Sequence, residues 1–360
     1  MTLHTPVPVM LLSQMLDAGG SERQLCEIAR TLDRERFEPH VGTMRPSGFR
    51  AVELAAAGVP VTVFPLGSFL SAGLLREALR LGRYTRRHGI RLVHAFDTPM
   101  NMFAVPAARA FGVPVVLASQ RSHRGLVPGA SRYLLRLADR IADAVVVNCR
   151  AVERHLVEEE HTPRESIRLC YNGVDTTLFR PGPRGDHPLR VGTLCVLREE
   201  KGVDVLLRGF ARVRCSRPVE LVIAGDGPMR ADLEMLAGSL GIAERVRFVG
   251  ATAEVAQALQ AMDVFVLASR SEALSNSLME AMACGCCAIA SNVGGNPELV
   301  RTGMLFESGD PASLAAMLDL VLENNELRQR LAREGMESIQ ANFSIESAAR
   351  AMSAIYESFL

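Results

Sequence analysis

The sequence predicts an α/β protein built from two Rossmann-like domains, each with a doubly wound parallel sheet. Three observations support this prediction: apolar runs of strand length recur along the chain, amphipathic stretches separate them, and the whole pattern occurs twice. A chain of 360 residues is long enough for two domains that each bury a core. Because strand–helix alternation at this spacing favours parallel pairing, we expect both halves to form open α/β sheets.

The predicted elements fall into two series. In the first half, strands are predicted at 6–14, 60–64, 91–96, 114–119 and 144–148, and helices at 21–32, 50–57, 72–88, 100–111 and 150–158. In the second half, strands are predicted at 190–197, 219–225, 246–250, 263–269 and 287–291, with helices between them. Ligands of open α/β sheets bind beyond the carboxyl ends of the strands, so we expect the functional site at a cleft between the domains.

A segment rich in proline and glycine, FRPGPRGDHP at 179–188, predicts the boundary between the two domains. We therefore expect a first domain over 1–180 and a second over 181–343. Residues 344–360 have the apolar spacing of an amphipathic helix, which is a candidate to cross back onto the first domain.

Charge and cysteine content narrow the functional classes. Basic and acidic residues number 40 each, which argues against a nucleic-acid-binding protein. The first 180 residues carry a net charge of +6 and the rest −6, so the first half is the one suited to an anionic membrane or acceptor. Scattered cysteines, with no leader and no apolar run of transmembrane length, predict reduced thiols in a cytoplasmic protein.

The segment SRSEALSNSLMEAMACGC, at 269–286, carries two acids around a predicted helix start. Ser277 and Glu280 match the capping-box pattern, in which Glu280 binds its own helix N-terminus and Glu272 is a solvated loop carboxylate. The alternative is that both carboxylates accept hydrogen bonds from ligand hydroxyls, while backbone N–H groups at the helix start bind a phosphate. The predicted phosphate-binding residues are Asn276, Ser277 and Leu278.

The basic residues are strongly biased, because Lys201 is the only lysine among the 40. It follows a predicted strand together with Arg198, and two cations at a strand–helix junction suit a diphosphate. The alternative is a solvated basic turn that pairs with Glu199 or Glu200.

Glycine-containing loops follow other predicted strands. In LDAGGSERQL, Gly19 and Gly20 precede a helix for which Ser21 is the expected N-cap residue. This helix start is a candidate anion site, and a plain turn is the alternative. AGDGPMR is a strand–helix junction, and its residues Gly225, Asp226 and Gly227 are predicted to contact the nucleotide-sugar, with a purely structural turn as the alternative. In SNVGGNPELV, Asn296 is the expected N-cap residue of the following helix.

Histidines at strand ends are further candidates for the chemistry. His94 and Asp97 end one predicted strand, and Arg121 and His123 follow another. A lone histidine at a strand end is, however, more often structural than catalytic. The sequence leaves both readings of these residues open.

Taken in order, these segments resemble the group 4 family of retaining glycosyltransferases, which have the GT-B fold. The resemblance is nearly end to end, through GGSERQL, YNGVDTTLFRP, EEKGVDVLL, VIAGDGPMRADLE and MDVFVLASRSEALSNSLMEAMACGC. The E-x7-E motif of that family falls on Glu272 and Glu280.

The resemblance implies transfer of a sugar, with anomeric retention, from a nucleotide-diphosphate sugar to a hydroxyl of a glycan, lipid or small metabolite. A UDP-sugar is favoured as donor, with GDP-mannose as the alternative. By resemblance, Glu280 binds the ribose, Glu272 the transferred sugar and Lys201 the diphosphate, opposite Gly19 and Gly20. The expected catalytic residues are Glu272, Lys201, Arg198 and His94. No metal or other cofactor is expected, because cations and helix dipoles stabilise the leaving diphosphate.

The sequence also departs from the family pattern. Val196 stands where the family often has arginine, with Arg198 as the candidate substitute. The usual active-site histidine is matched by Phe96 and Gln120, and the candidate substitutes are His94, Arg121 and His123. These departures keep two alternatives open, a catalytically inactive sugar-nucleotide-binding protein and a sugar-nucleotide epimerase. A nucleotide-dependent oxidoreductase is disfavoured, because no G-x-G-x-x-G follows a strand.

The segment LLREALRLGRYTRRHGIR, at 74–91, holds six arginines beside a leucine-rich face. It is a candidate for peripheral contact with the inner face of an anionic membrane, and an ordinary surface helix is the alternative.

Overall fold

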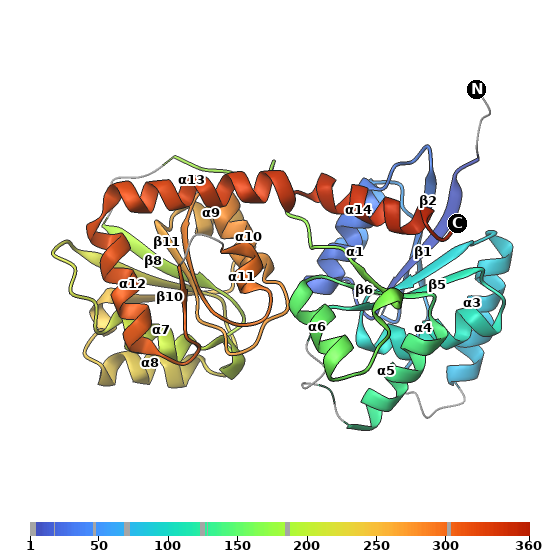
Figure 1. The fold of residues 1–360 in the computed structure, drawn as a ribbon, viewed down its shortest axis with the longest axis horizontal. Helices are drawn as coiled ribbons and strands as arrows, with labels where there is room; N and C mark the ends of the chain where they lie inside the picture. Colours follow the sequence, from blue (N-terminus) through green and yellow to red (C-terminus); the bar gives the residue numbers. More distant parts are fainter. Residues whose placement is uncertain are drawn as a thin grey trace. The chain divides into compact units, whose positions relative to one another are not determined.

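The computed structural model describes residues 5–17, 19–45, 48–67, 73–122, 127, 129–183, 188–300 and 304–360. The chain divides into two compact units (Figure 1). The first comprises Met1–Gly173 with Ile345–Leu360, and the second comprises Val174–Ser344. Residues 174–180 therefore pack with the second unit, and the last helix packs with the first.

The first unit contains a seven-stranded parallel sheet in the order β3-β2-β1-β4-β5-β6-β7. Its strands are β1 (Val7–Ser13), β2 (Phe37–Thr43), β3 (Val61–Val63), β4 (Leu92–Ala95), β5 (Val115–Gln120), β6 (Ala144–Val147) and β7 (Ile167–Leu169). Its helices are α1 (Gly20–Thr31), α2 (Phe49–Ala56), α3 (Gly73–Arg87), α4 (Thr98–Ala110), α5 (Gly129–Ile141), α6 (Arg150–Glu158) and α14 (Ile345–Glu357).

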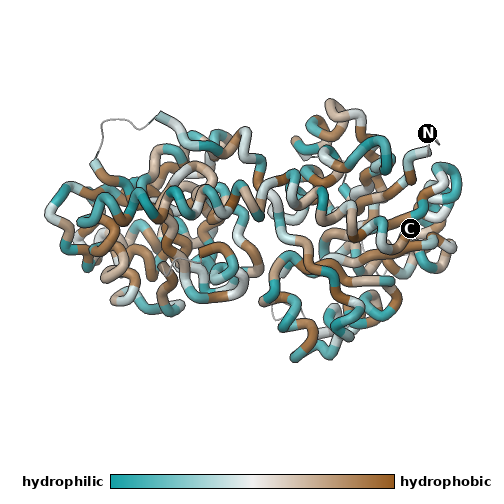
Figure 2. The backbone as a smooth tube through the Cα atoms, turned by 45° about the horizontal axis from the view of Figure 1, so that its top comes forward, coloured by the Kyte–Doolittle hydropathy of each residue, from teal (hydrophilic) through white to brown (hydrophobic). Residues whose placement is uncertain are grey.

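Helices cover both faces of this sheet, because alternate strand residues point to opposite sides. On β1, Val9 and Leu11 belong to a core shared with α1 and α14. The intervening Met10 and Leu12 belong to a second core, shared with α3 and α4. Figure 2 shows brown, hydrophobic stretches of backbone inside each unit, and coils at the outside along which teal and brown alternate. The predicted doubly wound parallel sheet is confirmed.

Two strands of the first sheet are not predicted by the apolar pattern. In β2, Glu38, Pro39 and Gly42 interrupt the apolar run, yet the strand lies inside the sheet between β1 and β3. Strand β7 has only three residues, and Arg168 occupies its middle. Both strands are specified by pairing with their neighbours rather than by their own hydropathy.

The last helix, α14, completes the first unit by packing beside α1 (Figure 1). Its Tyr356 is fully buried, and the ring meets Phe37 edge-on with 5.8 Å between the ring centroids. At the helix end, Glu357 pairs with Arg36 across 2.6 Å. The core of the first unit therefore depends on residues from the end of the chain.

The second unit contains a six-stranded parallel sheet in the order β10-β9-β8-β11-β12-β13. Its strands are β8 (Leu189–Leu194), β9 (Val219–Ala224), β10 (Val246–Gly250), β11 (Val264–Leu267), β12 (Cys287–Ser291) and β13 (Leu305–Phe306). Its helices are α7 (Val203–Phe210), α8 (Arg230–Ser239), α9 (Val255–Gln260), α10 (Asn276–Ala283), α11 (Asn296–Leu299), α12 (Pro311–Glu323) and α13 (Asn325–Asn342).

Each sheet has one point at which the strand order reverses. In the first sheet it lies between β1 and β4, and in the second between β8 and β11. The loops that follow these strand pairs diverge to opposite faces, which leaves room for a ligand at the carboxyl edge. The loops after β8 and β11 carry Lys201 and Glu272, so the topology alone places both residues at one edge.

All eight cysteines are free of disulfide bonds. Over the part of the chain that the structure describes, no helix is both long enough and apolar enough to span a membrane.

Candidate functional site

Lys201 and Glu272 meet where the second sheet reverses its strand order. Lys201 ends the short 3₁₀ helix η3 (Glu199–Lys201) after β8, and its Nζ lies 2.5 Å from Oε1 of Glu272. The same carboxylate oxygen accepts a hydrogen bond from Oγ of Ser269 at 2.9 Å. Both side chains are only partly exposed. Glu272 is therefore an oriented, charge-paired carboxylate and not the solvated loop residue of the capping hypothesis.

A third loop, after β12, packs against the backbone of Glu272. Gly294 has a φ of +54°, and a Cβ atom at this position would lie 1.8 Å from the carbonyl oxygen of Glu272. Next to it, the N–H group of Gly295 donates to the carbonyl oxygen of Ala273 at 2.6 Å. Only glycine permits this approach, so the loops after β8, β11 and β12 converge on Glu272.

Glu280 lies inside α10 and not at its start. The N-cap residue of α10 is Ser275, whose Oγ accepts from the N–H group of Leu278 at 3.3 Å. The capping box predicted from Ser277 is therefore wrong, because Glu280 falls in the second turn, beyond the position that reaches back. Its side chain is buried, at 3% exposure. The assignment of Glu280 to a ribose stays a prediction.

The first turn of α10 carries the residues expected to bind a phosphate. Asn276 and Ser277 are half-buried at the helix start, and Leu278 is buried beneath them. Helix N-termini attract anions, because first-turn N–H groups have no acceptor within the helix and the helix dipole is positive there. These three residues remain predicted phosphate ligands.

The glycines of the loop after β9 have a structural explanation. Gly225 has a φ of +128°, and a Cβ atom there would lie 1.8 Å from the carbonyl oxygen of Cys195. A Cβ atom on Gly227 would lie 2.5 Å from the carbonyl oxygen of Leu197. The exposed Asp226 accepts from the N–H group of Gly227 at 2.7 Å. Close packing of two loops accounts for both glycines, and ligand contact by this loop stays a prediction.

Arg198 fits the alternative of a solvated basic turn. Its side chain is exposed, and Nη1 lies 3.7 Å from Oε1 of Glu200. The neighbouring Val196 is exposed as well. A pair of this kind at the surface is weak, so Arg198 can exchange Glu200 for another anion at little cost.

The N-cap residue of α1 lies two residues earlier than predicted. The helix begins at Gly20 with Gly19 as N-cap residue, so the prediction of Ser21 as N-cap is wrong. Both glycines are exposed, and their assignment to the nucleotide-sugar site stays a prediction. Gln24 binds the backbone of Gly173 through its Nε2 at 2.9 Å and its Oε1 at 2.8 Å.

In the second unit, the short helix α11 has Gly295 as its N-cap residue, so the prediction of Asn296 is also wrong.

Asp97 joins the loops at the reversal point of the first sheet. It is the N-cap residue of α4 and accepts from the N–H group of Met100 at 2.9 Å. Its other oxygen accepts from Oγ of Ser13 at 2.7 Å and from the N–H group of Gln14. Burial raises the pKa of the Asp97 carboxyl. These bonds give Asp97 a structural role.

His94, a predicted catalytic residue, lies in the interior of the first unit. Its side chain has no exposed surface. Nδ1 lies 2.9 Å from the hydroxyl of Tyr356, and Nε2 lies 2.8 Å from the hydroxyl of Ser119. Burial, with a smaller contribution from the charge of Arg121, lowers the pKa of His94 well below 6.5. A neutral histidine with both nitrogens engaged positions α14, and it presents no surface to a substrate.

Arg121, another candidate to replace the family histidine, is engaged within the first unit. Arg121 donates from Nη1 to Oδ1 of Asn172 at 2.8 Å, and its guanidinium lies 4.7 Å from the ring centroid of Phe96. Burial lowers the pKa of Arg121 to about 10. His123 lies outside the described residues.

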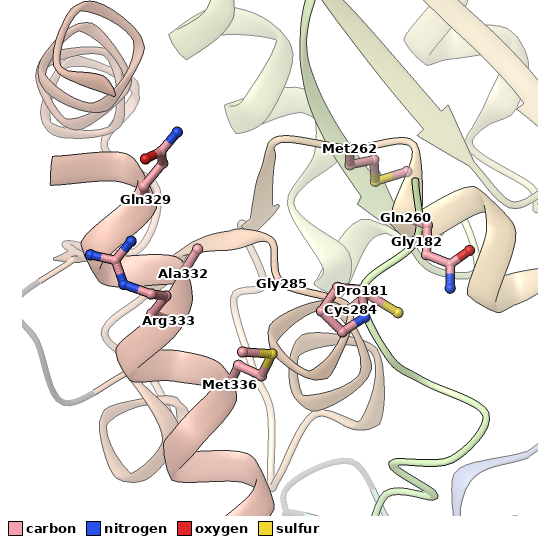
Figure 3. Close-up of a pocket in the computed structure, with 10 residues that line it drawn as sticks. All are labelled: Pro181, Gly182, Gln260, Met262, Cys284, Gly285, Gln329, Ala332, Arg333 and Met336. Carbon is pink, nitrogen blue, oxygen red and sulfur yellow. The ribbon is translucent and has the colours of Figure 1, made fainter. Parts of the chain in front are cut away.

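A cavity of about 270 Å³ in the second unit was not anticipated from the sequence (Figure 3). It is bounded by the 181–182 segment, the end of α9, the α10 terminus at Cys284, and α13. Because it opens at the C-terminal end of α10, about 12 Å of helix separates it from the predicted phosphate site that begins at Asn276. The chemistry assigned to Lys201 and Glu272 therefore does not use this cavity.

The solved structures that resemble this chain establish its fold. HepE of Anabaena in complex with UDP matches with a TM-score of 0.86 at 21% identity, over 98% of this chain and 100% of that one. WaaG, a glycosyltransferase involved in lipopolysaccharide biosynthesis, matches with a TM-score of 0.71 at 16% identity, over 97% and 99%. Two parallel-sheet α/β units with these neighbours define the GT-B fold.

Sequence comparison establishes the family. The family model described as glycosyl transferases group 1 matches residues 176–338, and the model described as Glycosyltransferase Family 4 matches residues 18–178. A D-inositol 3-phosphate glycosyltransferase from Thermobispora bispora is 31% identical, over 84% of this chain and 82% of its own length. The N-acetyl-α-D-glucosaminyl L-malate synthase of Bacillus anthracis is 29% identical, over 57% and 58%. The chain belongs to this group 1 and family 4 set of glycosyltransferases, and it is an enzyme of that class.

We expect the burial of His94 to make the free energy of unfolding depend on pH. The unfolded histidine titrates near 6.5, whereas the folded one has its pKa well below that value. As the pH falls below about 6.5, the unfolded state binds a proton that the folded state does not, so stability present above this pH is lost. Urea unfolding at about pH 8 and about pH 5.5 measures the loss.

His94→Gln should reduce that loss, because glutamine does not titrate. His161→Asn, at an exposed position on the same unit where the positive φ suits asparagine, is the control and should keep the wild-type dependence. An unchanged pH dependence in His94→Gln would show that His94 is not the titrating group.

Proposed function

We propose that the enzyme is a retaining glycosyltransferase that uses a UDP-sugar and needs no metal ion. The observation that carries the proposal is the contact between Lys201 and Glu272 at the reversal point of the second sheet. Structures of HepE are described with UDP and with UDP-glucose, which supports the choice of donor. A relative from Rhizobium meliloti, 30% identical over 68% of this chain, is named a mannosyltransferase, so GDP-mannose is the alternative donor.

The geometry suits loss of a diphosphate from an anomeric carbon. The Lys201 ammonium and the N-terminus of α10 offer positive charge to the departing diphosphate, where negative charge develops. Glu272, oriented by Lys201 and Ser269, accepts hydrogen bonds from hydroxyls of the transferred sugar. The buried carboxylate of Glu280 accepts from the ribose hydroxyls.

Retention follows from attack on the same face as the leaving group. The bond between the anomeric carbon and the diphosphate oxygen breaks, and the acceptor oxygen bonds to that carbon from the same side. The proton of the acceptor hydroxyl passes to the departing diphosphate. No protein nucleophile and no buried histidine is needed for these steps, which agrees with the interior position of His94.

For the acceptor side, we propose a surface on the first unit that contacts an anionic membrane. Helices α3, α4 and α5 lie side by side over one core of the first sheet. On α5, three large apolar side chains are exposed: Tyr133 at 72%, Leu134 at 51% and Leu137 at 53%. On α3, Leu75 and Leu79 are exposed beside the exposed arginines Arg83, Arg86 and Arg87. Apolar side chains beside cations suit the boundary of an anionic bilayer.

Substitutions at the three charged residues test the donor site. Glu280→Gln should weaken UDP binding by roughly 1.5–3 kcal/mol, the scale of a hydrogen bond to a charged group. Glu272→Gln should lower turnover more than it weakens UDP binding, because it contacts the sugar. Lys201→Ala should lower kcat/KM about 100-fold, or about 2.7 kcal/mol of leaving-group stabilisation. Calorimetric titration with UDP and transfer assays with UDP-glucose measure these effects.

The matched control is Glu254→Gln, which changes an exposed carboxylate outside the converging loops. Melting temperatures show which variants remain folded. Wild-type kinetics in both Glu272→Gln and Glu280→Gln would show that neither carboxylate binds the donor. Loss of activity on removal of metal ions by EDTA would contradict metal independence.

The membrane surface is tested by sedimentation with lipid vesicles. The enzyme should sediment with vesicles that contain phosphatidylglycerol and less with pure phosphatidylcholine, and binding should fall as salt is raised. Changing Arg83, Arg86 and Arg87 together to glutamate should abolish it. The same change at three exposed arginines of the second unit, Arg212, Arg214 and Arg217, is the control of equal charge. Equal sedimentation of both triple variants would exclude this surface.

A further inference from the structure

Arg270 joins the loop that carries Glu272 to the loop that carries Lys201. Its backbone N–H group donates to the carbonyl oxygen of Glu200 at 2.8 Å. Its side-chain Nη1 donates to the carbonyl oxygen of Glu199 at 2.7 Å. One residue thus binds two successive carbonyl groups of the short 3₁₀ helix that ends at Lys201.

The same guanidinium also binds a residue that follows Lys201 in the chain. Nη1 donates to Oδ1 of Asp204 at 2.9 Å, and Nη2 donates to Oδ2 at 2.7 Å, which is a two-point fork on a carboxylate. Burial acts to raise the pKa of Asp204, but hydrogen bonding and charge pairing with Arg270 outweigh it and the pKa is lowered. Asp204 lies in the first turn of α7, so Arg270 is attached both before and after Lys201 in the chain.

A glycine between Lys201 and Asp204 makes this attachment sterically possible. Gly202 has a φ of +61°, and a Cβ atom there would lie 2.0 Å from the carbonyl oxygen of Ala268. The turn after Lys201 therefore packs directly on the end of β11. Close packing of Gly202 on Ala268 sets how near the Lys201 loop lies to β11. The two hydrogen bonds from Arg270 to Asp204 set the orientation of that loop.

Arg270 differs from an ordinary surface ion pair in the sequence distance to its partners. Arg230, on α8, pairs with Asp226 and Glu234, each four residues away in its own turn or helix. Arg270 instead binds residues 66 and 71 positions away in sequence, on a different strand–helix connection. An exposed ion pair adds little to folding stability. The contacts of Arg270 are therefore better suited to holding the Lys201 loop in place than to stabilising the fold.

We propose that Arg270 is a positioning residue that holds the Lys201 ammonium against Glu272 and the donor diphosphate. The proposal rests on the proposed function of that site. Lysine has a long flexible side chain, so a fixed backbone is needed if its charge is to lie where the diphosphate departs. Asp204 is the partner through which the arginine acts.

The kinetic test uses variants of Arg270 in two backgrounds. Arg270→Ala should lower kcat by about 10- to 100-fold, the scale of a misplacement near 1 Å, with a smaller change in KM for the UDP-sugar. Arg270→Lys keeps the positive charge but cannot make the two-point contact, and Asp204→Asn weakens the acceptor of that contact. The kcat of both variants should therefore lie between those of Arg270→Ala and the wild type. In a Lys201→Ala background, Arg270→Ala should cause little further loss, because its effect passes through Lys201.

The matched control is Arg330→Ala, which breaks the exposed pair with Glu334 within α13. It should leave kcat unchanged in both backgrounds. An Arg270→Ala effect of the same size with and without Lys201 would overturn the positioning role, as would wild-type kcat in the single variant.

A readout independent of activity separates this inference from the proposed function. Hydrogen–deuterium exchange over residues 195–206 should be faster in Arg270→Ala than in the wild type and unchanged in Arg330→Ala. If the wild-type enzyme transfers no sugar from any UDP- or GDP-sugar, the proposed function fails, and the exchange rates still decide whether Arg270 orders the loop. Unchanged exchange over 195–206 would overturn the positioning role.

Discussion

The ion pair between Lys201 and Glu272 joins the two strands at which the second sheet reverses its order. These residues lie 71 positions apart, and they become neighbours only because β8 and β11 pair in a doubly wound sheet. Gly202 and Gly294 then let the surrounding loops approach to distances that no side chain would allow. The candidate chemistry of the enzyme depends on this contact, since it fixes a cation and a carboxylate at the edge where such sheets bind ligands.

The two sheets use their reversal points differently. In the first, Asp97 ties the ends of β1 and β4 together through hydrogen bonds to Ser13 and Gln14, and the neighbouring His94 is buried against α14. In the second, the corresponding tie is a charged pair that stays partly exposed. The same topology thus gives a closed structural junction in one unit and a junction open to a charged ligand in the other. This difference supports the proposal that the donor binds to the second unit.

The sequence predicted the fold class because alternating buried strands and amphipathic helices leave a strong local signal. It also predicted that Lys201 and Glu272 belong to one site, and the structure brings these two residues into contact. Their ligand roles and that of Glu280 stay predictions. It misplaced helix starts at Ser21 and Ser277, because consecutive small and polar residues offer several N-cap positions of similar free energy. The role of His94 could not be predicted, since its partner Tyr356 lies 262 positions away. Arg270 gave no signal of its own, because its contacts exist only after the strands pair.

A crystal structure of the enzyme with UDP tests the central assignment most directly. We expect the diphosphate to lie within about 3.2 Å of Lys201 Nζ and of first-turn N–H groups of α10, with the ribose hydroxyls on the Glu280 carboxylate. UDP bound with Lys201 still paired only to Glu272 and with Glu280 away from the ribose would contradict it. So would UDP in the cavity at the opposite end of α10 (Figure 3).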